Sequence, residues 1–271
     1  MKVFVLASGS SGNAAVFASS GTQILVDAGI SPDALMDRLS RAGHVPLLDA
    51  IVITHSHDDH LGQYKRIAEK FNLPVYMSEA TARYAQPKGQ VDLRYFHPQK
   101  AFSIGALTVS PLPLPHDAPQ VSLTIFDGRH RASIATDLGE VPPSLPEHLG
   151  QSEIVLIESN HDVEMLDRGP YPRHLKRRIL SARGHLSNEQ ARGLIKTFGN
   201  PVKTVVLMHL SKANNRAELA LDTARDALSG KKIHLHLAPA QGLLELDTCA
   251  PPAEGAWPRE KENGQRYLPG F

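Results

Sequence analysis

The segment Thr54–His60 (THSHDDH) carries three histidines and two aspartates in seven positions, directly behind an apolar run. Imidazole and carboxylate groups are the usual protein ligands of zinc, manganese and iron. His55 and His57 are two residues apart and point the same way in an extended chain, while Asp59 and His60 fall at the expected start of a helix. Any one of these residues alone would be typical of a polar turn with an aspartate helix cap, but the five together favour a metal site.

Three further residues of the same types each closely follow an apolar run. His116 lies in LPHDA, Asp137 in IATDLG and His209 in VVLMHLS. A loop histidine that serves only local hydrogen bonds is the commoner reading of any single case. Because loops that follow strands often carry the functional residues of α/β proteins, the recurrence predicts that all three join the first cluster.

Apolar β-rich runs alternate with helical patterns in two successive series. Strands are predicted at Lys2–Ala7, Ala15–Ala18, Gln23–Asp27, Ala50–Thr54, Ala106–Leu114, Val121–Phe126, Arg131–Ala135, Glu153–Glu158, Thr204–Met208, Ile233–Leu237 and Leu243–Leu246. Helices are predicted at Pro32–Ala42, His60–Phe71, Asn188–Phe198 and Arg216–Leu228. The pattern predicts an α/β architecture in which two sheets pack together with helices outside.

Composition limits the class of protein. The chain has 271 residues, 41% of them hydrophobic, so it can bury a full core as one large or two fused units. No run approaches the roughly 20 apolar residues of a membrane span. The apolar run in MKVFVLA is too brief for the hydrophobic region of a signal peptide, so a strand is expected there. With Cys249 as its single cysteine the chain has no internal disulfide, which favours a reducing, cytoplasmic location. A formal net charge of +1 means that a polyanion would have to bind a local basic patch.

The pattern HxHxDH at His55–His60, followed by His116, Asp137 and His209, resembles the metallo-β-lactamase superfamily. Longer motifs are similar to one branch, the YycJ/WalJ group of bacterial metal-dependent DNA exonucleases: ASGSSGNA, DAG, ESNHDVEML, YPRHLKRRILSARGHLSN and HLSKANN. The resemblance implies an αββα sandwich with a dinuclear metal site. It covers residues 1–249 as one metallo-β-lactamase domain, and leaves residues 250–271, rich in Pro, Gly and charge, as an extended or disordered tail.

The resemblance also implies a role for each candidate ligand. His55, His57 and His116 would hold one divalent metal; Asp59, His60 and His209 would hold the other; and Asp137 would bridge the two. Zinc and manganese suit this ligand set equally. Asp58 lies outside the ligand pattern, so a hydrogen bond to a ligand histidine or a helix cap is expected for it.

Residues beyond the ligands separate phosphodiesterases from other hydrolases of the superfamily. His185 in GHLSN resembles the histidine that protonates the leaving oxygen in relatives such as the tRNA 3′-processing enzymes, with Glu158 orienting it. These two residues and Asp59 are the predicted catalytic residues. The alternative is that His185 only caps the helix that begins near Ser187.

Substrate contacts are predicted in three segments. The Gly/Ser turn SGSSGN offers Ser10, Ser11 and Asn13 to a phosphate, although it could equally be an ordinary hairpin. The basic run RHLKRR, including Arg173, Lys176 and Arg177, is expected to contact the phosphate backbone, with a solvated helix face as the alternative. His161, Ser187 and Asn188 complete the predicted set.

The predicted function is a dinuclear metal-dependent phosphodiesterase that acts on nucleic acid through a metal-bound hydroxide. By resemblance it is a 5′ to 3′ DNA exonuclease, with DNA as partner and no association with membranes. Two alternatives stay open. One is a hydrolase of small esters or thioesters, similar to glyoxalases, which would not need His185, Glu158 or the basic run. The other is a metal-bound regulatory protein without catalytic activity.

Overall fold

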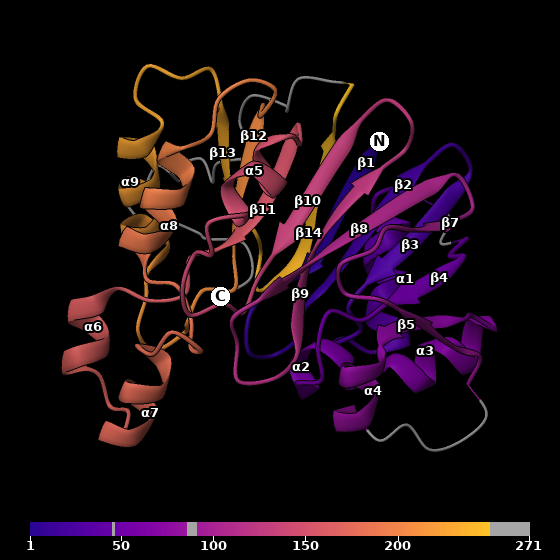
Figure 1. The fold of residues 1–271 in the computed structure, drawn as a ribbon, viewed down its shortest axis with the longest axis horizontal. Coiled ribbons are helices and arrows are strands. Elements are labelled where there is room, and N and C mark those ends of the chain that lie inside the picture. The colour runs from indigo at the N-terminus through magenta and orange to yellow at the C-terminus, as the bar shows by residue number, and fades with distance from the viewer. Residues whose placement is uncertain (45–46, 86–90, 250–271) are drawn as a thin grey trace, which may run out of the picture.

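A computed structural model describes residues 1–44, 47–85 and 91–249. Two sheets pack against each other and helices cover their outer faces (Figure 1), which confirms the expected αββα sandwich. The predicted C-terminal tail, residues 250–271, lies outside the described residues. Within the described ranges no helix has the length and apolar character needed to cross a membrane.

The first sheet has the strand order β14-β1-β2-β3-β4-β5-β6. Its strands are β1 (Lys2–Ala7), β2 (Ala14–Ser19), β3 (Thr22–Val26), β4 (Ala50–Val52), β5 (Val75–Ser78), β6 (Leu93–Phe96) and β14 (Gln241–Asp247). The pairs from β3 to β6 are parallel, whereas β14, β1, β2 and β3 pair antiparallel.

The second sheet has the order β13-β12-β11-β10-β9-β8-β7. Its strands are β7 (Phe102–Ile104), β8 (Leu107–Leu114), β9 (Gln120–Phe126), β10 (Arg131–Ala135), β11 (Ile154–Glu158), β12 (Thr204–Met208) and β13 (His234–Leu237). The pairs from β10 to β13 are parallel. Parallel strands place their carboxyl ends at one edge, so the loops after β3, β4, β10, β11 and β12 can meet there.

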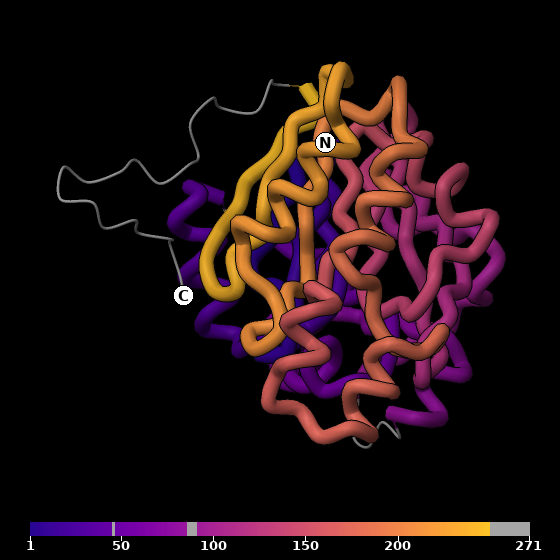
Figure 2. The backbone as a smooth tube through the Cα atoms, turned by 90° about the vertical axis from the view of Figure 1, so that its left-hand side faces the viewer, coloured from indigo at the N-terminus to yellow at the C-terminus, as the bar shows by residue number. Residues whose placement is uncertain are grey.

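Helices connect and cover these strands. They are α1 (Pro32–Arg41), α2 (Asp58–Leu61), α3 (Tyr64–Phe71), α4 (Glu79–Ala85), α5 (Leu145–Gly150), α6 (Val163–Arg168), α7 (Arg173–Ile179), α8 (Asn188–Lys196) and α9 (Ala217–Ala227). Helices α6 and α7 extend from one end of the second sheet (Figure 1), whereas α8 and α9 lie against its outer face (Figure 2).

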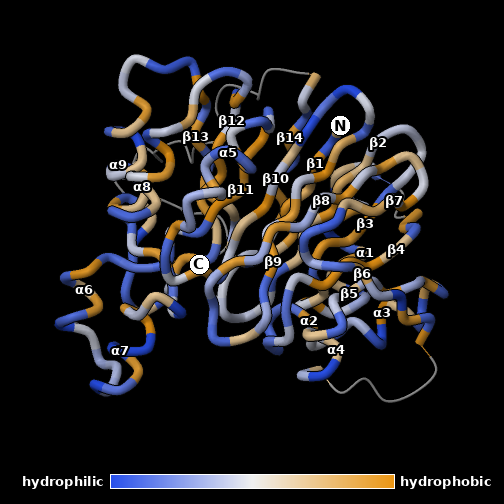
Figure 3. The backbone as a smooth tube through the Cα atoms, viewed as in Figure 1, coloured by the Kyte–Doolittle hydropathy of each residue, from blue (hydrophilic) through white to orange (hydrophobic). Residues whose placement is uncertain are grey.

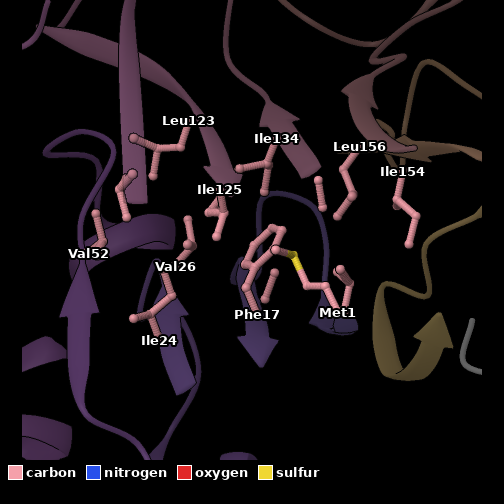
Figure 4. Packing of buried hydrophobic residues seen from close by; sticks show 14 of the residues in the cluster. Met1, Phe17, Ile24, Val26, Val52, Leu123, Ile125, Ile134, Ile154 and Leu156 are labelled. Atoms are coloured by element: carbon pink, nitrogen blue, oxygen red, sulfur yellow. The ribbon is translucent and has the colours of Figure 1, made fainter. Parts of the chain in front are cut away.

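The central core lies between the two sheets. Phe17 and Ile24 of the first sheet face Leu123, Ile125 and Ile134 of the second (Figure 4), and all five are buried. Continuous hydrophobic stretches run along these strands (Figure 3), as expected for strands that are covered on both faces. Burial of this apolar surface is the main force that holds the sheets together.

Two outer cores attach the helices to the sheets. Leu35 and Leu39 of α1 pack with Ile67 of α3 over the first sheet. Leu194 of α8 and Leu221 of α9 pack over the second sheet. The strand ends are therefore held rigidly from both sides, which gives the loops at the carboxyl edge fixed starting points.

Several elements differ from the prediction. The single helix expected over His60–Phe71 is two helices, α2 and α3, because the chain turns at Gly62 and Gln63. Strands β5, β6 and β7 and helices α4 and α5 were not predicted, since these segments are short or lie partly exposed, which weakens the hydrophobic pattern. Strand β14 also returns to pair with β1 instead of continuing the second series.

Candidate metal centre

The candidate residues lie where parallel strands end. Asp27 directly follows β3, His209 directly follows β12, and Asp137 lies two residues after β10. All three have positive φ angles, 60°, 56° and 58° respectively. This left-handed conformation is uncommon for residues other than glycine and costs on the order of 1–3 kcal/mol each. The two packed sheets tolerate this strain at three strand ends, one in the first sheet and two in the second.

The fold brings all seven predicted ligands together. Three groups of side chains have ligand atoms that lie within 4.8 Å of one another: His55, His57, His116 and Asp137; Asp59, His60 and His209; and Asp137, Glu158, His185 and His209. The first group contains the three histidines that the resemblance assigned to one metal, and the second contains the three residues assigned to the other. Asp137, the expected bridge, falls in the first and third groups and not in the second. Clustered histidine and aspartate side chains of this kind suit a divalent metal ion.

Asp27 holds His60 and was missed as a site residue. Its Oδ2 atom lies 2.8 Å from Nδ1 of His60, and its two oxygens also accept bonds from the hydroxyl of Thr54. A carboxylate on one ring nitrogen sets the orientation of a ligand histidine and leaves the other nitrogen to face the metal. The signal was available in the sequence, because Asp27 opens the DAG motif.

Asp117 plays the same part for His57 and was also missed. Its Oδ1 atom lies 3.1 Å from Nε2 of His57, and its Oδ2 accepts a hydrogen bond from Nε of Arg178 at 2.6 Å. Asp117 therefore connects the basic helix α7 to the candidate metal centre. Its position directly after His116 in LPHDA is the sequence signal that could have indicated it.

Several buried polar atoms in the cluster have no hydrogen-bond partner among the residues that the structure describes. These include Nε2 of His55 and Oδ2 of Asp137, and the latter lies 3.0 Å from Nε2 of His60 without hydrogen-bond geometry. Nδ1 of His57 and Nε2 of His116 face each other at 3.3 Å. Burying such atoms unpaired is costly, so a cation among them would satisfy this donor set.

The electrostatics of the cluster favour added positive charge. Burial by itself would lower the pKa of His60, but Asp137 and Asp27 raise it to about 10. Burial would raise the pKa of Asp137, yet His209 and His60 hold it well below its ordinary value. Burial and the neighbouring His60 lower the pKa of His55 well below its ordinary value. The buried carboxylates thus stay ionised and need a cation or protonated histidines beside them.

His185 and Glu158 form the contact that the sequence predicted. Nδ1 of His185 lies 2.8 Å from Oε1 of Glu158, and 17% of the His185 side chain remains exposed. Oε2 of Glu158 accepts bonds from the backbone N–H groups of Leu138 and Leu186. Burial would raise the pKa of Glu158, but His185 and His209 lower it to about 2. Glu158 is therefore a buried carboxylate fixed by backbone donors.

The alternative role for His185 as a helix cap is wrong. The N-cap of α8 is Ser187, whose side chain accepts a bond from the N–H of Gln190 within a complete capping box. Asn188 is buried and bonds to Ser159 and Asn215. These side chains hold the loop in place, and the contact of Ser187 and Asn188 with substrate stays a prediction.

The N-terminal Gly/Ser turn divides into a buried and an exposed part. Asn13 is buried, closes the turn through Gly9, and lies 2.8 Å from Nε2 of His60. Asn13 therefore supports the turn, and its contact with a phosphate stays a prediction. Ser10 and Ser11 are exposed.

A glycine lets this turn approach the cluster. A Cβ atom at Gly29, in the DAG motif, would lie 1.9 Å from the carbonyl oxygen of Asp59. The close approach therefore requires glycine at this position.

Two other predicted residues have distinct surroundings. His161 is buried, neither of its ring nitrogens has a hydrogen-bond partner among the described residues, and burial lowers its pKa to about 4. Asp58 is exposed at the first position of α2, and the N-cap is His57, so the expected cap by Asp58 is wrong.

The basic run forms helix α7. Arg173 and Arg177 are exposed and make no hydrogen bond or ion pair within the described part of the chain. Lys176 donates to the carbonyl oxygen of Asp167, and Arg178 binds Asp117. Counting only partners in the described ranges, two cations of the run are thus unpaired and two have structural partners.

Comparison with known proteins identifies the family. Residues 22–210 match the model of the β-lactamase superfamily domain, and the chain belongs to this family. The metallo-β-lactamase fold protein YhfI from Bacillus subtilis has the same fold, with a TM-score of 0.70 and 19% identity over 90% of this chain and 98% of that one. With its clustered histidine and aspartate residues, the chain is a metal-dependent hydrolase of this family.

Within the family, the chain is similar to one group of curated proteins. It is 38% identical over 229 residues to exodeoxyribonuclease WalJ of Streptococcus pneumoniae, which covers 81% of this chain and 85% of that one. It is 34% identical over 236 residues to exodeoxyribonuclease YycJ of Bacillus anthracis, covering 84% of this chain and 89% of that one. The resemblance to the YycJ/WalJ group is therefore confirmed.

Proposed function

We propose that this protein is a nuclease that uses two divalent metal ions, zinc or manganese, to hydrolyse phosphodiester bonds in DNA. One ion would be held by His55, His57 and His116, the other by Asp59, His60 and His209, with Asp137 between them. When bound, two such ions would activate a water molecule and neutralise charge on the phosphate. The names of the WalJ and YycJ relatives support DNA as the substrate.

The chain's own residues would handle the proton of the leaving group. His185 is partly exposed and contacts Glu158, whose ionised carboxylate raises the affinity of the ring for a proton. A protonated His185 would donate to the departing oxygen, and Glu158 would hold the ring in place. Departing alkoxides need this help, so the His185–Glu158 contact beside the ligand cluster is the observation that carries the proposal.

Other parts of the chain would bind the substrate. Ser10 and Ser11 are exposed next to the cluster, and Arg173 and Arg177 present exposed positive charge on α7. Binding through these residues would be independent of sequence and sensitive to salt. The proposal includes 5′ to 3′ exonuclease action, by resemblance to the YycJ/WalJ group, and a cytoplasmic location, where DNA and reduced thiols occur together.

The alternatives explain fewer of these features. Hydrolysis of a small ester or thioester would use the same ligands but would not need the His185–Glu158 pair or the exposed arginines of α7. A regulatory protein without activity would not need a partly exposed histidine beside a buried carboxylate.

The decisive experiment is an assay of metal-reconstituted protein. Single- and double-stranded DNA and RNA, each labelled at the 5′ or 3′ end, would be compared with a thioester and a lactam, and Asp137→Ala would serve as the inactive control. We expect mononucleotides released progressively from the 5′ end of DNA. Turnover of the thioester or lactam alone would contradict the proposal.

A further inference from the structure

A pocket of about 420 Å³ lies beside the candidate metal centre. Three segments that are distant in sequence form it: the end of β1 with Ser8 and Gly9, the segment after β12 from Leu210 into α9, and the connection between β13 and β14. The volume falls in the range of pockets that bind small organic molecules. None of the seven candidate ligands is among the residues that line it.

The pocket shares a wall with the candidate ligands. The backbone N–H of His209 donates to Oγ of Ser8 at 2.7 Å. Ser8 and Leu210, the residue after His209, both line the pocket. On its other rim Gln241 donates to Oγ of Ser11 at 3.3 Å. The pocket therefore opens between the metal centre and the exposed part of the Gly/Ser turn.

The lining has an apolar interior and a charged rim. Leu210, Leu237 and Ala238 contribute apolar surface. Lys212 and Arg216 stand at the rim, both exposed, and neither forms an ion pair or side-chain hydrogen bond with any residue that the structure describes. Glu218 is the one acidic residue among the described residues of the lining, so Lys212 and Arg216 leave the rim with a net positive charge.

We propose that this pocket binds one nucleotide of the DNA strand next to the bond that is cut, an inference that rests on the proposed function. A nucleobase is flat and apolar on its faces, which fits the interior. The phosphate attached to it is an anion, which fits Lys212 and Arg216. A nucleotide held here would position the neighbouring phosphodiester at the metal centre, because Ser8 and Leu210 line the pocket and both adjoin the candidate ligand His209.

The two halves of the ligand allow the two parts of the pocket to be tested separately. Binding of dAMP, deoxyadenosine and deoxyribose 5-phosphate to the full-length, metal-loaded protein would be measured by calorimetry. Ala240→Phe would place a large side chain in the pocket, with Ala101→Phe at an exposed position as control. Lys212→Gln with Arg216→Gln would remove the rim charge, with Lys232→Gln as control for a surface lysine elsewhere.

We expect wild-type protein to bind dAMP at least about tenfold more tightly than deoxyribose 5-phosphate, since the sugar phosphate lacks the base. Ala240→Phe should abolish that preference. The double charge variant should bind dAMP about tenfold more weakly and bind deoxyadenosine as the wild type does, because only the phosphate contacts the rim. The charge changes lie on exposed side chains, so they test the proposal even if Ala240→Phe fails to fold.

Equal binding of dAMP and deoxyribose 5-phosphate by the wild type, or pocket variants that match their controls, would overturn the inference. Cleavage of end-labelled DNA by the wild type is measured in parallel. If the protein cuts DNA but shows no preference for the base, only the nucleotide-binding role of the pocket is contradicted. If it prefers dAMP but cuts no DNA, the proposed nuclease function is contradicted.

Discussion

Nδ1 of His185 and Oε1 of Glu158 lie 2.8 Å apart at the edge of the ligand cluster. The same oxygen lies 3.0 Å from Nδ1 of His209. One buried carboxylate thus connects the proposed proton donor with a proposed metal ligand, and variants of the two partners should have different effects.

Replacing His185 by alanine should remove the proton donor and leave the metals bound. We expect kcat on DNA to fall about 10²–10⁴-fold, the usual contribution of a general acid. An activated nitrophenolate departs without protonation, so bis(p-nitrophenyl) phosphate should be cleaved at a much less reduced rate. An equal loss on both substrates would show that His185 is not the acid.

Glu158→Gln should affect more than proton transfer. Because Glu158 also contacts His209, the variant should lose metal as well as activity, which metal analysis after dialysis would measure. His185→Ala is the matched comparison. If both variants retain the same metal content, the contact with His209 does not contribute to metal binding.

Asp27→Asn should weaken metal binding although Asp27 is not itself a proposed ligand. Loss of a carboxylate that orients a ligand histidine typically costs about 10- to 100-fold in metal affinity. Competition with a chromogenic chelator would measure the change. Asp33→Asn is the control, because Asp33 pairs with Lys70 on the surface, and a wild-type affinity in Asp27→Asn would contradict the role assigned to the Asp27–His60 contact.

The exposed arginines Arg173 and Arg177 of α7 should each contribute to the affinity for DNA. Arg173→Gln with Arg177→Gln should weaken DNA binding and reduce the slope of log K against log salt by roughly two. Arg129→Gln, an exposed arginine in the turn between β9 and β10, provides the control. An unchanged slope would mean that α7 is only a solvated surface.

His148 should make the fold sensitive to acid. His148 lies in α5, with its Nε2 atom 3.1 Å from Oγ1 of Thr124. Burial lowers the pKa of the ring from 6.5 to about 4. The unfolded chain therefore binds more protons between these values, so stability falls as pH drops from about 6.5 toward 4.

His148→Gln should reduce this acid-induced loss of unfolding free energy by on the order of 1 kcal/mol. This value is smaller than the full pKa shift implies, because the ring is partly accessible to solvent. Thermal unfolding at pH 7 and pH 4.5 would measure it, with His174→Gln on exposed α7 as control. A wild-type pH dependence in His148→Gln would contradict the assignment.

Local sequence determined the parts of this protein whose chemistry is contained in short segments. Apolar runs predicted most of the central strands, because burial on both faces requires such runs. The seven ligand candidates were recognisable because each is a histidine or carboxylate near a strand end. The same reasoning missed edge strands β6 and β7, whose partial exposure weakens the pattern.

The tertiary structure alone decided which distant residues meet. Asp27 and His60 are 33 positions apart, Asp117 and Arg178 are 61 apart, and Ser8 and His209 are 201 apart. Strand β14 pairs with β1 across the whole chain, which creates one wall of the pocket. Such contacts depend on strand order and register, which result from packing of the entire core, so no local pattern of residues encodes them.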